Sequence, residues 1–247
     1  MQIKNVKVYG LEESIMASGY PMQTGEPIDL EDIFDPAMSK LNNYLYAGTD
    51  DSKDAIRAKK LAKTPIGSGH NNFLKGIIVQ FDMKYPQYLF SQLDRYNFWE
   101  DISDGILPKT TDVMTIISSQ SKMHKLTSIK DVENYCNGYV LWSIIDKLNE
   151  LIACYNLDSY PVVLEDRLHK DNSETQVIAT NRVDMFQYII SNLPMGYELW
   201  MRVSMNYSQI KTIWNQRCKH KHKLKDWEEF GDFVKTLPMA AELIYGD

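Results

Sequence analysis

The chain has 247 residues, of which 44% are hydrophobic and 24% are charged, and its formal net charge is −6. This balance is typical of a globular protein with a sizeable core, and the negative charge gives no overall attraction for nucleic acid or acidic membranes. The sequence has no apolar run that could span a bilayer and no signal-peptide pattern at its start. Three scattered cysteines predict free thiols in a reducing cytoplasm. We therefore expect a cytoplasmic protein that binds neither nucleic acid nor membrane.

The first third of the chain predicts strands, short helices and loops. Apolar and polar residues alternate over 2–10, which predicts a half-buried strand that ends at Gly10. Segment 21–54 carries three prolines and several acids, which indicate loops around a short helix. The elements expected before residue 84 are that short helix, a second helix, a tight loop and a strand, over 38–46, 54–63, 67–72 and 74–83, respectively.

The middle of the chain predicts three helices. Pro86 suits the first turn of a helix that runs to about Trp99, because the N–H that proline lacks would be unsatisfied there. Residues 104–108 are predicted to interrupt the regular secondary structure. Apolar residues recur at steps of three and four over 139–155, which is the clearest amphipathic pattern in the sequence. A further helix over 183–191 ends near Pro194.

Two more helices are expected after Gly196. The first carries Leu199, Val203 and Ile210, and the second runs over 227–237. Asp226 and Glu229 have the spacing of a capping box. The sequence has no repeats and no linkers between domains. The elements together predict one α/β (α+β) domain with more helix than sheet.

The sequence carries none of the common catalytic or metal-binding motifs that would identify a reaction. The glycines at 67 and 69 lack the third glycine of a dinucleotide fingerprint, and no Walker-type loop or nucleophile elbow is present. His220 and His222 lie among lysines that would repel a cation, so no metal site is predicted.

One arginine stands out on physical grounds. Arg217 continues the apolar stripe of Ile210 and Ile213, so its side chain is expected to face inward or into a cleft. It is either a paired arginine at the rim of the core or a ligand for a planar anion or a uracil-like edge, which the guanidinium fork suits. Both interpretations stay open at this point.

Four strings resemble motifs of one family. Residues 92–97 read Gln-Leu-Asp-Arg-Tyr-Asn, similar to Gln-x-x-Arg-His-Arg, and residues 119–124 read Ser-Gln-Ser-Lys-Met-His, similar to Glu-x-Ser-x-Arg-Tyr. The spacing from Leu-Pro at 193–194 to Asn206 and Arg217, and the Trp-Glu pair at 227–228, are also similar. The chain thus resembles the flavin-dependent thymidylate synthases (ThyX), as a divergent viral, phage-like member.

The resemblance implies a fold and a set of site residues. The fold is a single ThyX-like domain over 1–247, helix-rich with a small sheet and with divergent insertions near 20–55, 104–115 and 155–180. Arg217 is the implied catalytic residue, because an arginine beside the pyrimidine stabilises charge that develops on the ring. The implied substrate-binding residues are Gln92, Arg95, Ser121 and His124, and the implied cofactor-binding residues are Arg95 and Asn206.

The resemblance also implies a reaction and an assembly. A ThyX-like methyltransferase converts dUMP to dTMP with FAD, with methylene-tetrahydrofolate and NADPH as co-substrates, at a site shared between subunits of a homotetramer. Six positions depart from the family pattern, namely Tyr96, Asn97, Ser119, Met123, His124 and Ile190. Two alternatives therefore stay open: altered chemistry on a pyrimidine nucleotide, and a non-catalytic nucleotide-binding or assembly protein with the same fold.

Overall fold

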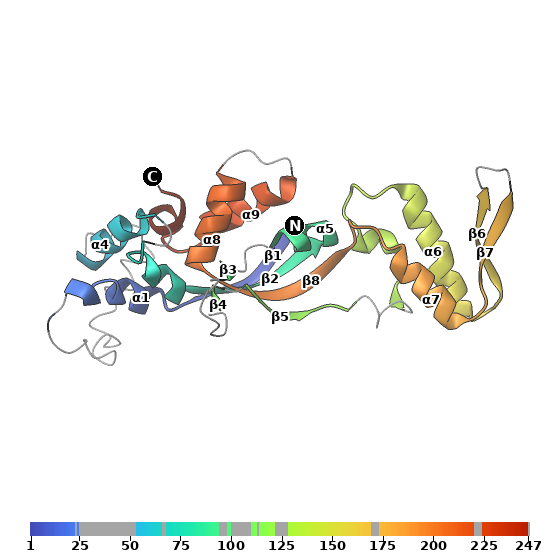
Figure 1. Ribbon diagram of the computed structural model, residues 1–247, viewed down its shortest axis with the longest axis horizontal. Helices are drawn as coiled ribbons and strands as arrows, with labels where there is room; N and C mark the ends of the chain where they lie inside the picture. The colour runs from blue at the N-terminus through green and yellow to red at the C-terminus, as the bar shows by residue number, and fades with distance from the viewer. Residues whose placement is uncertain are drawn as a thin grey trace, which may run out of the picture. The chain divides into compact units, whose positions relative to one another are not determined.

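The structure is a computed structural model, and it describes residues 1–22, 24, 53–65, 68–93, 98–99, 110–112, 114–121, 128–168, 173–219 and 224–246. The chain forms two compact units (Figure 1). The first unit contains residues 1–83, 92–118 and 201–247, and the second contains residues 84–91 and 119–200. The chain therefore passes from one unit to the other several times.

A four-stranded sheet with the strand order β1-β2-β8-β5 is the central element. Its strands are β1 (Gln2–Tyr9), β2 (Ile78–Pro86), β8 (Glu198–Asn206) and β5 (Thr115–Ser119). Along β2 and β8 every second side chain is buried, as the period of a strand requires when one face covers a core. The two strands are hydrogen-bonded neighbours, and each has residues in both units.

Helices and a small hairpin complete the first unit. They are α1 (Leu11–Ala17), α4 (Lys53–Ala62), β3 (Phe98–Trp99), β4 (Thr110–Asp112), α8 (Tyr207–Ile213), a π-helix (Trp214–Cys218), α9 (Lys225–Lys235) and a second π-helix (Ala241–Tyr245). The core holds an aromatic cluster in which Phe233 lies 4.9 Å from Phe81 and 5.6 Å from Phe230, between ring centroids. The apolar face of α9 is thereby packed on β2.

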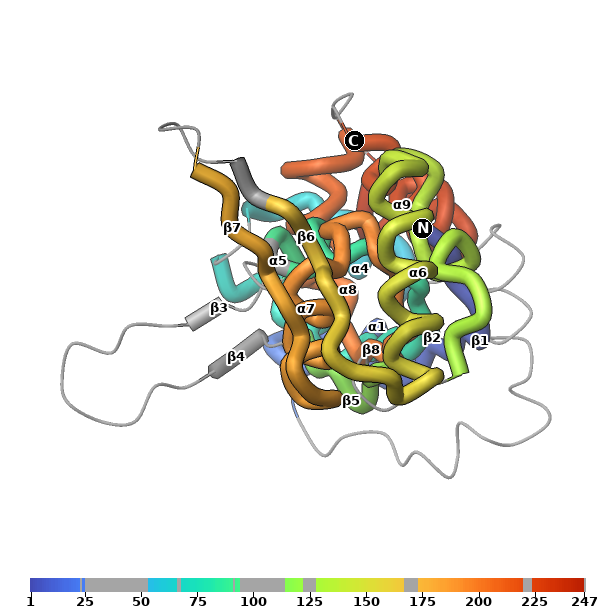
Figure 2. Tube along the Cα trace, turned by 90° about the vertical axis from the view of Figure 1, so that its right-hand side faces the viewer, coloured from blue at the N-terminus to red at the C-terminus, as the bar shows by residue number. Residues whose placement is uncertain are grey.

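The second unit is built on two helices and a hairpin. Helix α6 (Trp142–Leu157) packs on α7 (Arg182–Ser191), and the antiparallel hairpin of β6 (Val162–Leu168) and β7 (Glu174–Ala179) lies beside α7 (Figure 2). Helix α5 (Gln87–Leu93) begins in this unit and ends in the first. The buried residues between α6 and α7 come from both helices: Ile145, Leu148, Leu151, Ile152, Met185 and Ile189.

Several predicted elements are confirmed. The strand over 2–10 is β1, the helix over 54–63 is α4, and the helices over 139–155 and 183–191 are α6 and α7. The mixed fold of helices and small sheets is confirmed as well. The predicted helix at 38–46 and the break at 104–108 lie outside the described residues. Strands β6 and β7 lie within the segment near 155–180, where an insertion is expected.

Three boundary predictions are wrong. The strand expected over 74–83 is displaced because residues Asn72–Gly76 form a 3₁₀ helix, so β2 begins at Ile78. Pro86 ends this strand, and α5 begins at the next residue. The helix expected to reach Trp99 ends at Leu93, since Phe98 and Trp99 pair with β4.

Two predictions near the C-terminus are also wrong. Leu199 and Val203 lie on β8, because a spacing of four residues keeps side chains on one face of a strand as well as of a helix. Asp226 and Glu229 form no capping box: α9 is preceded by Leu224, which makes no side-chain cap, and both acids lie inside the helix. Their carboxylates contact the Met1 ammonium instead.

Candidate functional site

A buried indole joins two helices in the first unit. Trp227, in the first turn of α9, is fully buried, and its Nε1–H donates a 3.1 Å hydrogen bond to Oε1 of Gln92. An indole nitrogen can only donate, so Gln92 must turn its amide oxygen toward Trp227. Gln92, for which the resemblance implies substrate binding, is thus held at the C-terminal end of α5 against α9.

Arg217 meets the same indole. This half-buried residue lies on the π-helix Trp214–Cys218, and its guanidinium carbon is 5.7 Å from the centroid of the Trp227 ring. That distance is within the range of a cation–π interaction. Two of the residues predicted for the site, Gln92 and Arg217, therefore border one aromatic side chain, one at its polar edge and one at its face.

The π-helix and α9 approach closely because of a glycine. Gly231 follows Trp227 by four residues and so lies on the same face of α9. A Cβ at Gly231 would be 3.3 Å from Cβ of Cys218 and 3.5 Å from the ring of Trp214. Burial here raises the pKa of the Cys218 thiol to about 12, so this cysteine is a packing residue. A π-helix is a local widening that often accompanies a functional position, and here it carries Arg217.

Asn206 has a role in the helix that leads to Arg217. It is buried at the end of β8, and its Oδ1 accepts a 2.9 Å hydrogen bond from the backbone N–H of Gln209. The Gln209 side chain returns a 3.0 Å bond to the backbone N–H of Asn206, which completes a capping box at the start of α8. The side-chain oxygen of this predicted cofactor residue is therefore occupied by the helix cap.

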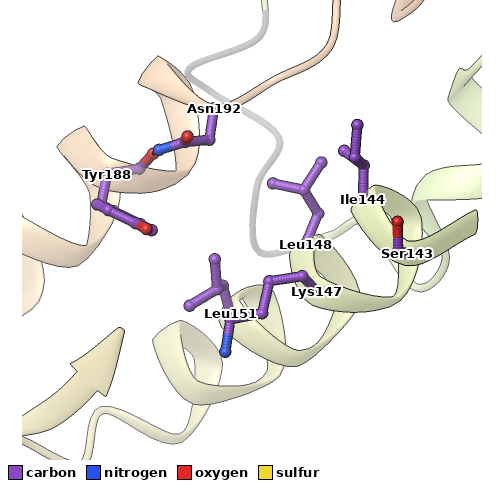
Figure 3. Close-up of a pocket in the computed structure, with 7 residues that line it drawn as sticks. All are labelled: Ser143, Ile144, Lys147, Leu148, Leu151, Tyr188 and Asn192. Atoms are coloured by element: carbon purple, nitrogen blue, oxygen red, sulfur yellow. Dashed lines mark hydrogen bonds between the residues drawn. The ribbon is translucent and has the colours of Figure 1, made fainter. Parts of the chain in front are cut away.

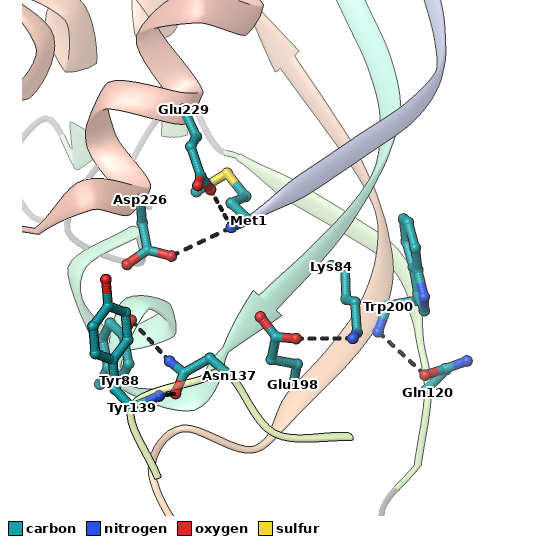
Figure 4. Close-up of polar contacts among 10 residues, drawn as sticks. All are labelled: Met1, Lys84, Tyr88, Gln120, Asn137, Tyr139, Glu198, Trp200, Asp226 and Glu229. Carbon is teal, nitrogen blue, oxygen red and sulfur yellow. Dashed lines mark hydrogen bonds and ion pairs between the residues drawn. The ribbon is translucent and has the colours of Figure 1, made fainter. Parts of the chain in front are cut away.

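Ser121 belongs to the second unit, where it is exposed just after β5. The preceding residue, Gln120, is fixed to β8 by two hydrogen bonds: its N–H donates to the carbonyl of Trp200 at 2.9 Å, and its Oε1 accepts from the N–H of Trp200 at 3.2 Å (Figure 4). Arg95 and His124, the remaining predicted substrate residues, lie outside the described residues, as do Tyr96, Asn97 and Met123. Ile190 is half-buried on α7.

Carboxylates in both units are paired with positively charged groups. In the first unit the Met1 ammonium lies 3.6 Å from Asp226 and contacts Glu229, so the acids of α9 beside Trp227 are matched by a positive charge (Figure 4). In the second unit, Lys84 of β2 and Glu198 of β8 form a 2.8 Å pair with little exposure. Among the described residues, no group of three His, Cys, Asp or Glu is placed to hold a metal ion.

A cavity in each unit lies apart from the residues that the sequence singled out. One, of about 320 Å³, is in the second unit between α6 and α7, where Lys147 and Tyr188 border an apolar wall (Figure 3). The other, of about 620 Å³, is in the first unit and is lined by Arg57 and His70 among mainly apolar residues. The polar loop around His70, which the sequence predicts as a tight turn, forms part of the wall of this cavity.

Two of the described residues carry hydrogen-bond donors that could contact a ligand. The guanidinium of Arg217 and the amide of Gln92 are donors of the kind that bind base carbonyls. Of the two residues expected at FAD, Asn206 uses its oxygen in a helix cap and Arg95 lies outside the described residues.

Comparison with known proteins gives a fold match without a sequence match. No model of a protein family matches the chain, and no curated protein matches it in sequence. A crystal structure of flavin-dependent thymidylate synthase ThyX from Helicobacter pylori, complexed with FAD and dUMP, matches with a TM-score of 0.59 and 12% identity over 99% of this chain and 98% of that one. A second structure of the same enzyme with FAD and dUMP has a TM-score of 0.54, the same identity and the same coverage. The chain therefore has the ThyX fold. No helix among the described residues is long and apolar enough to cross a membrane.

Proposed function

We propose that the chain binds a pyrimidine nucleotide, dUMP, with the base beside Arg217 and Gln92. The observation that carries this proposal is the convergence of these two residues on Trp227, one through a hydrogen bond and one over the ring. The solved structures that share the fold are complexes with dUMP, which supports the choice of nucleotide.

Arg217 has the central chemical role in this proposal. Its guanidinium donates to a base carbonyl and stabilises negative charge on the ring, which makes it the catalytic residue if the base reacts. Its half-buried position strengthens that interaction, because charge is screened less away from bulk water. Arg95, Ser121 and His124 are proposed to complete the nucleotide contacts.

Methylation of dUMP to dTMP, with FAD, methylene-tetrahydrofolate and NADPH, is the reaction proposed for this site. FAD would supply the reducing chemistry when bound. A non-catalytic nucleotide-binding protein is the second candidate, and a specific observation favours it: Ile190, a half-buried aliphatic residue on α7, stands where the resemblance places a substrate-binding arginine.

Nucleotide binding is tested by calorimetric titration of dUMP into the wild-type protein and two arginine variants. Arg217→Ala should weaken dUMP binding by about 10- to 100-fold, the range for losing a hydrogen bond to a charged group. Arg182→Ala is the matched control, because Arg182 also lies over an aromatic ring, that of Tyr155, in the second unit. Equal affinity in the wild type and Arg217→Ala would contradict the proposal.

The reaction is tested separately on the same protein. A visible spectrum after addition of FAD reports flavin binding, and formation of dTMP from dUMP with both co-substrates reports methylation. Bound flavin with product supports the enzyme, whereas tight dUMP binding without flavin binding supports the non-catalytic candidate.

A further inference from the structure

We propose that Trp227 is a positioning residue that locks the amide of Gln92 in one orientation, and that this orientation makes the site select uracil over cytosine. The inference rests on the proposed nucleotide site and goes beyond it, because it assigns base discrimination to a buried residue that does not touch the nucleotide.

The locking follows from the chemistry of the two side chains. An amide can be turned by 180° with little change in shape, so packing alone would not decide which end faces the base. The indole N–H of Trp227 donates to Oε1 of Gln92 at 3.1 Å. This contact leaves Nε2 of Gln92, with its two N–H groups, directed away from Trp227. Among the residues that the structure describes, Nε2 makes no hydrogen bond.

Burial makes the reversed amide unfavourable. Trp227 is 0% exposed and is held edge-on by Phe230, with ring centroids 6.0 Å apart. Its N–H cannot turn to solvent, so the reversed amide would place two donors together in a buried position. Leaving one buried donor unsatisfied disfavours that state by about 5- to 150-fold.

The locked amide makes the proposed base-binding groups all donors. Arg217 has only N–H groups to offer, and Gln92 presents N–H groups for the reason given above. Uracil carries a carbonyl acceptor at the position where cytosine carries an amino donor. The amino group of cytosine would therefore face the N–H groups of Arg217 and Gln92, and these donors could not hydrogen-bond to one another. A site whose donors bind the uracil carbonyl discriminates against a base that lacks this acceptor.

The experiment compares dissociation constants for dUMP and dCMP in the wild type, Trp227→Phe and Gln92→Glu. The wild type should prefer dUMP by about tenfold or more. Trp227→Phe keeps an aromatic ring under Arg217 but removes the donor, so the preference should fall toward one. Gln92→Glu presents a carboxylate oxygen to the base and should shift the preference toward dCMP. Trp142→Phe, at an exposed tryptophan of the second unit, should keep the wild-type ratio.

The outcomes separate this inference from the proposed function. A wild-type protein that binds neither nucleotide overturns the proposed site itself. A wild type that prefers dUMP, with the same preference in Trp227→Phe, leaves the site standing and overturns the role of Trp227. Should Trp227→Phe fail to fold in a melting experiment, Gln92→Glu decides: an unchanged preference for dUMP contradicts the inference, and a reversed one supports it.

Discussion

Each of the two compact units places an arginine over an aromatic ring. In the second unit, the guanidinium carbon of Arg182 is 4.1 Å from the ring centroid of Tyr155, and its Nη1 is 3.2 Å from a carboxylate oxygen of Asp158. Hydrogen bonds to Tyr155 and Asp158 raise the pKa of Arg182. In the first unit, Arg217 lies 5.7 Å from the ring of the fully buried Trp227.

The difference lies in what surrounds each ring. Arg182 ties the first residue of α7 to the end of α6 at an exposed surface, where its carboxylate partner has a 61% exposed side chain. Trp227 belongs to the aromatic core, and its polar atom holds Gln92. An arginine over an aromatic ring therefore does not by itself indicate a binding site. The first-unit pair is the one proposed as a site because the same indole also hydrogen-bonds Gln92.

The largest expected effect comes from removing the support under Trp227. Phe230→Ala should lower the free energy of unfolding by about 3–5 kcal/mol, because Phe230 is fully buried between Trp227 and Phe233. Chemical denaturation measures this loss. The variant should also bind dUMP more weakly, since Trp227 loses the ring that holds it.

Phe186→Ala is the control in the second unit. Phe186 is half-buried on α7, with its ring centroid 6.2 Å from that of Tyr155, so its removal should cost about 1–2 kcal/mol and leave dUMP affinity unchanged. A larger loss of affinity in Phe186→Ala than in Phe230→Ala would erase the distinction between the two regions.

The sequence predicts local elements well and their ends poorly. The amphipathic stripe that predicts α6 is right because Ile145, Leu148 and Leu151 do share a buried face. The sequence predicts a helix where β8 lies, because Leu199 and Val203 fit the periods of both a helix and a strand. The intervening Met201, also buried, was the available sign of a strand.

Only part of the candidate site can be predicted from the sequence. Arg217 was singled out because it interrupts an apolar stripe, and the resemblance supplied Gln92. The hydrogen bond from Trp227 to Gln92 joins segments far apart in the chain, so no local pattern reveals it. The helix cap at Asn206 was missed for a different reason, since the Asn and Gln three residues apart that form it lie where a continuous helix was expected.

Two ion pairs link β2 to β8, one in each unit. The Lys84 and Glu198 side chains of the second unit are 18% and 12% exposed, whereas those of Arg202 and Asp82 in the first unit are 25% and 29% exposed. Glu198→Gln should therefore destabilise the protein by about 1–3 kcal/mol, because it leaves the Lys84 ammonium with little solvent and no carboxylate. Thermal melting at neutral pH measures the change. A smaller loss than for Asp82→Asn would contradict the ranking by burial.

The contribution of the more exposed pair, Arg202 and Asp82, to stability should depend on pH in the acidic range. Hydrogen bonds from Asn5 and Arg202 hold the pKa of Asp82 below its usual value. A depressed pKa means that the stability contributed by Asp82 is present above the unfolded pKa of about 3.9 and is lost as pH falls through the lower folded value. Asp82→Asn should lower stability by about 0.5–1 kcal/mol at pH 7. Melts at pH 7 and pH 2 should show the difference from wild type shrinking in acid, and a constant difference would exclude this origin.

Gly231→Ala should cause the smallest change in stability, and it tests most directly how the position of Arg217 affects binding. Gly231→Ala gains about 1 kcal/mol of helix propensity in α9, but its Cβ would lie 3.3 Å from Cβ of Cys218, so the π-helix must move by a few tenths of an ångström. The two effects oppose each other, and the melting temperature should change little. Arg217 moves with the π-helix, so dUMP affinity should fall by about two- to fivefold. Gly138→Ala, which places its Cβ in open space in the second unit, should change neither quantity. A variant at Gly231 with unaltered affinity would mean that the distance between the π-helix and α9 does not matter to the site, and that Arg217 resembles Arg182 after all.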